Sequence, residues 1–486
     1  MTRDRSPTIV WFRQDLRVED NPALFEASAR GGPVIPVYIW AREEEGEWPL
    51  GGASRWWLHR SLASLHKDLV KLGSNLIFRQ GESLPHLQRI AMDTHAGAVY
   101  WNSRYEPDAV VRDAWVEGKL RGWGIEVATF NANLLFEPWE IKTQKEDPYQ
   151  VFTPFWKSCL SASHLIPDLL PVPKRLTPPK TWPPGQPLAD LQLEPHFDWA
   201  DGLRQTWDPG PSGAANRLEG FLVDRLGGYK DDRRRVDVAG TSMLSPHLHF
   251  GEIGPRQVWH AVQDACGRSK EKTAGMQSFL SELGWREFAH HLLYHFPQTS
   301  NEPLRKQFAR FPWKKHRKQL EAWQKGRTGY PIVDAAMRHL RAAGWMPNRA
   351  RMIVASFLTK DLMIPWQEGA KWFWDTLVDA DLGNNTLGWQ WTAGCGADAA
   401  PFFRIFNPVS QGEKFDPEGD YVRQWVPELR AVPDRWIHKP WEAPESGGLG
   451  YPSPIVDHKE ARERALEAYE SVRENAALRS PRRKET

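Results

Sequence analysis

The sequence has few cysteines and no long apolar segment. Its three cysteines, Cys159, Cys266 and Cys395, are far apart in a chain of 486 residues. This excludes a disulfide-stabilised scaffold and an all-cysteine zinc or iron–sulfur site, and it suits a reducing compartment. No apolar run approaches the roughly 18 residues that a membrane-spanning helix needs, and the first residues lack a signal-peptide pattern. We therefore expect a cytoplasmic protein without a membrane anchor.

The sequence also lacks a glycine-rich dinucleotide fingerprint, although its first 130 residues alternate between strand and helix patterns. The turn after the first strand pattern reads FRQDLR, not GxGxxG. Helix signals, such as the Asn21-Pro22 start and the amphipathic Ser54–Leu72 closed by Gly73, separate the strands. Strand patterns occur at Thr8–Trp11, Val34–Trp40, Asn75–Phe78, Ala98–Trp101 and Glu126–Phe130. This alternation predicts a parallel sheet covered by helices on both faces.

The remainder of the chain divides into a proline-rich connection and a long helical part. Eleven prolines lie between Pro167 and Pro211, a composition that prevents long helices. After about residue 212, strand patterns fade and helical periodicity dominates. We expect an α/β domain at 1–135, a linker at 136–211, an all-α domain at 212–475 and a frayed basic tail at 476–486.

Charge and tryptophan are unevenly distributed. The formal net charge is only +2, yet residues 301–360 contain 14 Lys/Arg and 3 Asp/Glu. Such a block can neutralise nucleic-acid phosphates, and it can equally be a solvated helical surface. The chain has 26 tryptophans, which suits core packing but also stacking on flat ligands or electron transfer.

Two segments of the helical part carry groups suited to phosphates and bases. Gly228–Ser245 ends in a hydroxyl-rich run before a helix, which can hold a phosphate but is also a common helix cap. Within Phe279–His295, Glu282 and Arg286 are four residues apart with Trp285 beside them. On one helix face they could bind a base, or they could be an exposed ion pair beside a core tryptophan.

Two later segments suit a flat heterocycle. In Trp345–Phe357, Pro347 fits a first helical turn, after which Asn348, Arg351 and Met352 share a face. In Asp379–Trp391 a helix would place Asp381, Asn385 and Trp389 on one face. A buried Asp381 would need a partner, and Arg351 is the candidate type.

Several motifs together closely resemble the DNA photolyase/cryptochrome family over nearly the whole chain. They are WFRQDLRVEDNPAL near the start, then TGYPIVDAAMRHL, GWMPNRARM, DADLGNNTLGWQW and GADAAPFFRIFNPVSQGEKFDPEGDYVRQWVPEL. The resemblance implies a Rossmann-like doubly wound sheet, a wrapping linker and an all-helical domain that holds FAD in a U-shape.

The resemblance also implies the cofactor residues. Arg351 and Asp379 match the family's salt bridge beside the isoalloxazine, and Asn385 matches the residue that faces flavin N5. The whole implied set is Tyr229, Thr241, Ser242, Met243, Leu244, Ser245, Phe279, Glu282, Arg286, Asn348, Arg351, Asp379, Asp381 and Asn385.

The resemblance further implies light-driven repair of cyclobutane pyrimidine dimers in UV-damaged DNA. Photolyases carry Asn at the position of Asn385, where plant cryptochromes typically carry Asp; an amide tolerates the anionic reduced flavin better than a carboxylate does. The (6-4) photolyases carry histidines in the segment that here holds Pro347, Asn348 and Met352. Implied substrate and DNA contacts are Arg233, Glu282, Trp285, Arg286, Asn348, Arg349, Met352 and Trp391.

In the implied reaction, light-excited FADH⁻ donates an electron to a flipped-out dimer, the ring splits and the electron returns, with no metal. Trp389, Trp366 and Trp313 match the tryptophan chain that photoreduces the flavin; each taken singly could be a core residue. Glu282, Asn385 and these tryptophans are the expected catalytic set.

The light-harvesting antenna is the least defined feature. Gly51–Leu58 (GGASRWWL) resembles plant cryptochromes and their bacterial relatives, the class III photolyases, which suggests 5,10-methenyltetrahydrofolate between the domains. Tyr105–Ala109 (YEPDA) departs from the YEVNE of folate-binding class I enzymes, so those contacts cannot be transferred; Glu43, Glu44 or Glu45 could contact a pterin instead.

Three alternatives remain open at this point. The first is a cryptochrome-like blue-light photoreceptor with the same fold and flavin, and the second a helical nucleic-acid-binding protein without flavin chemistry. The third is a (6-4) photolyase. We expect a monomer in each case.

Overall fold

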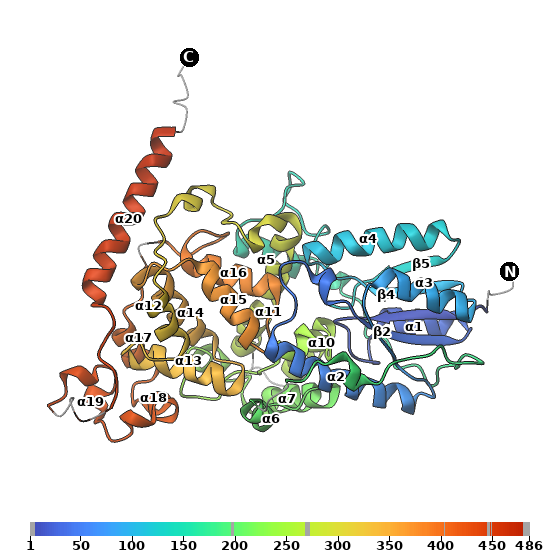
Figure 1. The fold of residues 1–486 in the computed structure, drawn as a ribbon, viewed down its shortest axis with the longest axis horizontal. Helices are drawn as coiled ribbons and strands as arrows, with labels where there is room; N and C mark the ends of the chain where they lie inside the picture. Colours follow the sequence, from blue (N-terminus) through green and yellow to red (C-terminus); the bar gives the residue numbers. More distant parts are fainter. Residues whose placement is uncertain are drawn as a thin grey trace, which may run out of the picture. The chain divides into compact units, whose positions relative to one another are not determined.

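Five parallel strands form the sheet that the sequence predicts. Their order is β3-β2-β1-β4-β5, so the chain starts in the centre and builds outward on each side in turn. Figure 1 labels β2, β4 and β5 of this sheet together with the helices α1, α3 and α4. The strands are β1 (Thr8–Phe12), β2 (Val34–Trp40), β3 (Ile77–Gln80), β4 (Ala98–Asn102) and β5 (Glu126–Phe130). The third strand begins two residues later than expected, because the Asn75 side chain turns back to accept a hydrogen bond from the backbone of Leu76.

The computed structural model describes residues 5–195, 199–267, 273–402, 404–444, 448 and 450–479. The chain forms two compact units. The sheet unit comprises Met1–Gly227, Ser242–Pro297 and Leu377–Leu382, and the helical unit comprises Gly228–Thr241, Gln298–Thr376 and Gly383–Thr486. The sheet unit thus includes residues 212–227 and 242–297, beyond the α/β domain and linker expected from the sequence, whose functional bounds stay a prediction.

Helices cover the sheet as the alternating pattern predicts. On one face, Leu87 and Val116 join the buried cluster that contains Ile9 and Trp11. The first helix begins where Asn21 accepts a hydrogen bond from the Leu24 backbone at 3.1 Å, which confirms the predicted cap. The four helices between the strands are α1 (Pro22–Arg30), α2 (Gly52–Lys71), α3 (Ser83–Thr94) and α4 (Pro107–Gly122).

Further helices belong to the sheet unit. In the described part of the proline-rich connection before Pro195, one 3-10 turn forms, at Leu188–Leu191, consistent with its composition. The helices are α5 (Phe152–Ser161), α6 (Asp201–Thr206), α7 (Pro211–Asp224), α9 (Ser245–His249), α10 (Pro255–Gly267) and α11 (Thr273–His295).

The FRQDLR turn joins the sheet to these helices. The Arg17 guanidinium is buried and donates to the carbonyls of Gly251 and Ala132 at 2.9 Å each. It also lies 3.8 Å from Asp20, whose carboxylate pairs with Arg256 at 3.0 Å. One buried arginine therefore ties three distant segments of this unit together.

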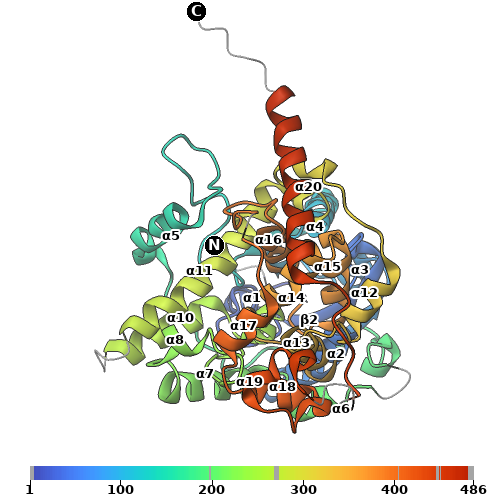
Figure 2. The ribbon, with the colours of Figure 1, turned by 90° about the vertical axis from the view of Figure 1, so that its left-hand side faces the viewer.

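The helical unit contains no strand among its described residues, as predicted. Its central helix, α13, packs against α14, α17 and α18 (Figure 2). Asp334 fixes the start of α13, because its carboxylate accepts from the backbone and hydroxyl of Thr328 at 2.7 Å each. The helices are α8 (Tyr229–Asp232), α12 (Arg317–Gln324), α13 (Pro331–Ala343), α14 (Asn348–Ser356), α15 (Trp366–Thr376), α16 (Leu382–Ala393), α17 (Pro408–Phe415), α18 (Asp420–Trp425), α19 (Asp434–Ile437) and α20 (His458–Arg479).

The last helix extends into the predicted tail. Residues 476–479 are still part of α20, and the remainder of the tail, residues 480–486, lies outside the described residues. The middle of α20 is anchored in its own unit, where Tyr469 stacks on Phe402 with ring centroids 4.6 Å apart. In the described part of the chain, no helix combines the length and apolar character that crossing a bilayer requires.

Candidate cofactor and DNA site

The Leu377–Leu382 segment is fixed within the sheet unit by three side chains. The Ser54 hydroxyl donates to the Leu377 carbonyl at 3.1 Å, and the Ser245 hydroxyl donates to the Asp379 carboxylate at 2.6 Å. The third, the His290 imidazole, lies 3.2 Å from the Asp381 carboxylate. Hence the structure brings Ser245, Asp379 and Asp381, which the sequence singled out separately, into one place.

Within the sheet unit, Asp381 is paired with histidines, which the sequence analysis did not consider. Its carboxylate faces the imidazoles of His290 and, at 3.6 Å, His249. Burial raises the pKa of Asp381, but the two nearby imidazoles, His290 foremost through its charge, outweigh it and hold the pKa well below its usual range. Within the sheet unit, these histidines therefore supply a partner for the buried Asp381, while pairing with Arg351 stays a prediction.

The expected stacking of Asp381 on a helix with Asn385 and Trp389 is wrong for Asp381. α16 begins at Leu382, so Asp381 lies just before it, in the segment that Ser54, Ser245 and His290 hold. These tertiary contacts override the helical spacing. Asn385 and Trp389 do lie one turn apart on α16.

The hydroxyl-rich run is not an ordinary helix cap. Leu244 precedes α9, and no side chain caps this helix end. Met243 has a positive φ of 53°, a backbone conformation that costs energy in a residue with a Cβ and that clusters at ligand sites. The Ser242 hydroxyl oxygen accepts a hydrogen bond from the Leu244 backbone N–H at 3.4 Å. The run thus presents a strained, hydroxyl-lined loop beside Asp379.

The α11 residues expected near the substrate are held by packing. The Trp285 ring stacks on Phe152 with centroids 3.8 Å apart and planes 10° apart. The Arg286 guanidinium donates to the Asn133 carbonyl at 2.5 Å, and Phe279 packs against Phe221 at 4.5 Å. Glu282 lies one turn before Arg286 on the same partly exposed stretch.

Basic residues gather near the start of α14 in the helical unit. The Arg349 guanidinium lies over the Phe415 ring, 4.4 Å from its centroid. Burial and the positive charges of Arg233, Arg234 and Arg404 lower the pKa of Arg349. Arginines this close repel one another, which favours an anion between them.

The other predicted residues of α14 are placed as follows. α14 begins at Asn348, so Pro347 precedes the helix and does not lie in its first turn. The Arg351 Nε donates to the Met346 carbonyl at 3.0 Å. Met352, one residue on, is partly exposed. In the short α8, Tyr229 is buried and the Arg233 guanidinium lies 5.7 Å from the centroid of its ring.

α16 and α15 hold the predicted redox residues except Trp313, which precedes α12. The Asn385 amide donates to the Ala370 carbonyl at 3.1 Å, which fixes the orientation of the amide and leaves its oxygen as the acceptor. Trp389 packs edge-on against Phe373 at 5.0 Å. Trp366 is buried, whereas Trp313 is partly exposed and contacts Phe311 at 4.4 Å. Trp391 is also partly exposed.

Sequence reasoning missed His249 and His290. Both are buried, and their ring nitrogens lack a hydrogen bond of good geometry within the described residues. A signal was present, because His290 continues the four-residue spacing of Glu282 and Arg286 along α11. Their role became visible only when the fold brought Asp381 to them.

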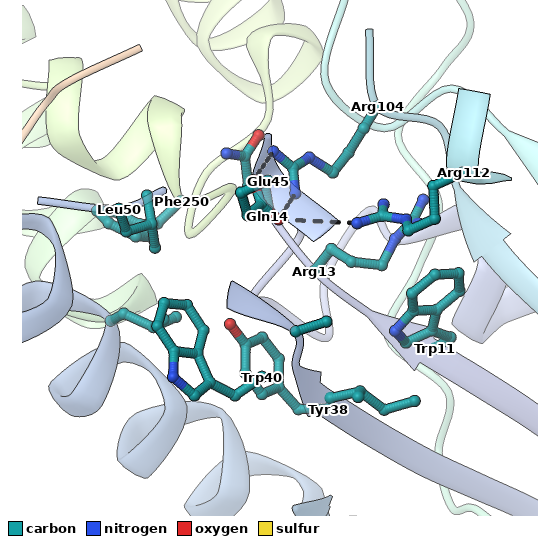
Figure 3. A pocket seen from close by; sticks show the side chains of 13 residues that line it. Trp11, Arg13, Gln14, Tyr38, Trp40, Glu45, Leu50, Arg104, Arg112 and Phe250 are labelled. Atoms are coloured by element: carbon teal, nitrogen blue, oxygen red, sulfur yellow. Dashed lines mark hydrogen bonds and ion pairs between the residues drawn. The ribbon is translucent and has the colours of Figure 1, made fainter. Parts of the chain in front are cut away.

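A small cavity lies at the carboxyl ends of β1 and β2. Figure 3 shows Arg104, Arg112 and Glu45 pointing toward one another across it. Arg104 donates to Glu45 at 2.8 and 3.0 Å, and Arg13 lies 4.3 Å from the centroid of the Trp11 ring. With a volume of about 30 Å³, the cavity has room for water but not for a second chromophore in this side-chain arrangement.

The three glutamates considered for a pterin differ in their surroundings. Glu45 is bonded to Arg104, and Glu44 accepts from the Ser83 backbone at 2.7 Å. Glu43 is exposed on the 3-10 turn Arg42–Glu45. Of the three, Glu43 therefore retains the most accessible carboxylate.

Comparison with known proteins identifies the class of this fold and site. Residues 8–177 match the family described as "DNA photolyase", and residues 279–471 match "FAD binding domain of DNA photolyase". The molecule is thus a flavoprotein of the photolyase type, with an α/β part followed by a helical FAD-binding part.

The relatives extend this match to the whole chain. The deoxyribodipyrimidine photo-lyase of Agrobacterium fabrum is 47% identical over 97% of this chain and 99% of its own. Arabidopsis thaliana cryptochrome-1 is 42% identical over 95% of this chain and 70% of its own. A crystal structure of a class III photolyase from Agrobacterium tumefaciens superposes with a TM-score of 0.93 at 47% identity, covering 98% of this chain and 99% of that one. The chain belongs to the DNA photolyase/cryptochrome family.

The residues present fit FAD. The strained Met243 loop supplies hydroxyls and backbone groups, and Ser245 holds the Asp379 carboxylate beside it. The buried ring nitrogens of His249 and His290 are polar groups whose hydrogen-bonding capacity the protein alone does not use fully. Such incompletely satisfied groups are expected where a polar ligand completes a site.

Proposed function

We propose that this protein is a deoxyribodipyrimidine photo-lyase, a carbon–carbon lyase that repairs cyclobutane pyrimidine dimers in UV-damaged DNA under blue light. The observation that carries the proposal is Asn385 on α16, whose amide is held by the Ala370 carbonyl. A neutral amide at the position matched to flavin N5 tolerates a reduced, anionic cofactor, whereas a carboxylate would repel it. The identity with the Agrobacterium photo-lyase supports the same activity.

The chain's own residues would bind and orient the cofactor. Tyr229 and Thr241–Ser245 would hold its phosphates and ribityl chain, while Phe279, Glu282, Arg286, Asn348, Arg351, Asp379, Asp381 and Asn385 would surround its rings. FAD, when bound and reduced, supplies the light-driven electron that splits the dimer. Ser245 and His290 would keep Asp379 and Asp381 in fixed positions during this transfer, because both carboxylates are hydrogen-bonded or paired.

The damaged DNA would be held by charge and its dimer by packing. Arg233 and Arg349 would bind phosphates together with Arg404, since these guanidiniums already lie close enough to depress the pKa of Arg349. A dimer disturbs base stacking, so flipping it from the duplex costs less than flipping normal bases. Glu282 would hydrogen-bond the pyrimidine edge, and Trp285 and Trp391 would pack against the flipped pair with Arg286, Asn348 and Met352.

Electrons for reducing the cofactor would come through Trp389, Trp366 and Trp313. The partly exposed Trp313 suits the outer end of such a chain, and the buried Trp389 its inner end. None of these steps needs a metal ion.

We further propose 5,10-methenyltetrahydrofolate as the antenna, with Glu43 as a contact of its pterin. The GGASRWWL segment forms the first turns of α2, where Trp56 and Trp57 are buried. Arg104, Arg112 and Glu45 fill the cavity at the carboxyl ends of β1 and β2, which supports an antenna site elsewhere. The protein would act as a cytoplasmic monomer, with an antenna domain at 1–135, a linker at 136–211 and a catalytic domain at 212–475.

The deciding experiment measures dimer loss directly. Photoreduced protein is incubated with an oligonucleotide that carries one thymine cyclobutane dimer, with and without blue light, and the dimer is followed by chromatography. Light-dependent loss supports the proposal, and Trp285→Ala should slow it by removing the ring that packs against the flipped pair. No loss with fully reduced, bound FAD would overturn it.

A cryptochrome-like photoreceptor is the second candidate, favoured by the 42% identity with Arabidopsis cryptochrome-1. It would bind the same flavin without repairing DNA. The same assay separates the two, because a photoreceptor would change its flavin spectrum under blue light while the dimer remained intact.

A further inference from the structure

A rare helical turn places a lysine inside the helical unit. After α14 the chain winds through the π-helical turn Phe357–Asp361, in which the Leu362 backbone donates to the Phe357 carbonyl at 3.0 Å. Lys360 lies on this turn, and only 1% of its surface is exposed. Turns of this kind have poorer hydrogen-bond geometry than an α-helix and are frequent at functional sites. Lys360 is thus a buried amine to which the proposed repair reaction assigns no role.

The Lys360 amine contacts both ends of one loop. Residues 393–402, here called the 393–402 loop, start at the last residue of α16. The Nζ atom donates to the Ala393 carbonyl at 3.0 Å and to the Phe402 carbonyl at 3.5 Å. It also lies 3.3 Å from the centroid of the Phe402 ring, which stacks on Tyr469 of α20. One amine therefore joins the first and the last residue of the loop.

The surroundings of the amine show that its N–H groups account for these contacts. Burial lowers the pKa of Lys360 to about 7, against a raising effect of the Cys395 thiol. The thiol itself stays neutral, because burial raises the pKa of Cys395 to about 12. Near neutral pH the amine is therefore present in both its charged and its neutral form. Either form has enough N–H groups to donate to both carbonyls.

The loop ends next to a residue that the proposed function assigns to DNA. Arg404 follows the loop, and its backbone donates to the Pro401 carbonyl at 2.9 Å, which ties Arg404 to the end of the loop. The charge of Arg404 also contributes to lowering the pKa of Arg349, so the two guanidiniums belong to one basic cluster. A change in the position of Phe402 would therefore move Arg404 within this cluster.

We propose that Lys360 is a positioning residue for DNA binding, which closes the 393–402 loop and thereby holds Arg404 in place for a phosphate. The inference rests on the proposed function in one respect, that Arg404 binds DNA. Without the amine, two buried carbonyls lose a donor and the closed loop becomes less stable. An open loop would weaken the binding of DNA. It would leave the light-driven step unchanged once the DNA is bound.

Hydrogen exchange measures the closure of the loop directly. Lys360→Met keeps the length of the side chain and removes its donors, whereas Lys360→Gln supplies two N–H groups without a charge. In FAD-loaded Lys360→Met protein, the loop amides that donate to the Gln390 carbonyl should exchange about tenfold faster than in the wild type, since one hydrogen bond accounts for roughly that factor. Lys360→Gln should restore slow exchange. Thr359→Val is the matched control, because the Thr359 hydroxyl donates to Ala355 of its own helix.

Repair kinetics connect the loop to DNA. For an oligonucleotide with one thymine cyclobutane dimer, Lys360→Met should raise KM by up to about tenfold and leave kcat unchanged, while Lys360→Gln should resemble the wild type. Unchanged exchange in Lys360→Met, or equally fast exchange in Lys360→Gln, would overturn the role of the amine. Faster exchange with an unchanged KM would overturn the placement of Arg404.

The test remains decisive if Lys360→Met does not fold. Phe402→Leu then replaces it, because this variant keeps the backbone carbonyl and withdraws the ring from the amine. Exchange of the loop amides at the wild-type rate in Phe402→Leu would overturn the proposal. A wild-type protein that repairs no dimer would count against the photo-lyase assignment, whereas loop exchange, measured in the dark without DNA, would still decide whether Lys360 closes the loop.

Discussion

The two units hold their candidate residues by different physics. In the sheet unit the contacts around the Leu377–Leu382 segment and the FRQDLR turn are polar and ionic: Ser245 bonds Asp379, His290 pairs with Asp381, and Arg17 ties three backbone segments together. In the helical unit they are mainly aromatic, with Trp389 packed on Phe373 and Trp323. Buried charges fix positions through directed bonds, whereas large rings fix them through shape. A flavin enzyme needs both kinds of contact, because charged groups must be held in fixed positions and aromatic rings must be close enough for electron transfer.

Removing a buried charge should lower the free energy of unfolding more than any other change proposed here, and the loss should be confined to the sheet unit. Arg17→Ala leaves Asp20 and two carbonyls partly uncompensated in a dry environment, so the free energy of unfolding should fall by about 3–5 kcal/mol. Chemical denaturation followed by tryptophan fluorescence measures this. Arg60→Ala, which removes an exposed pair with Glu194, is the matched control and should cost less than about 1 kcal/mol. Equal losses in both variants would refute the assigned role of Arg17.

The buried Glu287 should give the sheet unit a pH dependence. Burial raises the pKa of Glu287 from 4.5 to about 7, against the lowering charges of Arg286 and His290. The folded state then holds this proton more tightly than the unfolded state. The resulting stabilisation is fully present below about pH 4.5 and is lost as the pH rises through about 7.

Glu287→Gln removes this titration while keeping an oxygen to accept from the Leu135 backbone. Between pH 5 and pH 8, the wild type should therefore lose up to about 2 kcal/mol of unfolding free energy more than the variant does. Exposed Glu219→Gln on α7 serves as the control and should follow the wild type. Parallel pH curves for wild type and Glu287→Gln would show that Glu287 is ionised in the folded protein.

The aromatic half should be sensitive to volume. Gly369→Ala places a methyl group against the Trp389 ring, and overpacking of this kind costs about 1–3 kcal/mol. Gly388→Ala on α16 adds the same methyl into open space, where removal of a helical glycine should stabilise by about 0.5–1 kcal/mol. Thermal unfolding of the two variants should therefore shift in opposite directions. If the unfolding temperatures of both variants shifted in the same direction, the packing between α15 and α16 would have to accommodate an added methyl group without strain.

The polar and the aromatic contacts also differ in how much of them could be predicted from the sequence. Strand patterns predicted all five strands to within two residues at each end, and Asn21 predicted its cap, since these signals are local. The position of Asp381 before α16 was not predictable from the sequence. Ser54 and His290, which hold its segment, are far from it in the chain, and their contacts override the helical spacing. His290 continued the four-residue spacing of Glu282 and Arg286, but neither it nor His249 could be paired with Asp381 before the fold was known. Asn385 came from a family motif, and Trp366 and Trp313 from their match to the family's tryptophan chain; their roles stay predictions.

Asn385 combines a polar contact with an aromatic neighbourhood. Its amide donates to the Ala370 carbonyl of α15, the helix whose Phe373 packs against Trp389. Asn385→Asp adds a like charge beside an anionic reduced flavin, which should weaken that state by about one pKa unit's worth of free energy, or roughly tenfold in occupancy. Dimer repair by photoreduced protein should slow by a similar factor. Asn384→Asp, the neighbouring position on α16, is the control. If both variants repair at the wild-type rate with fully reduced flavin, position 385 does not select for repair, and the assignment would have to rest on the DNA-binding residues instead.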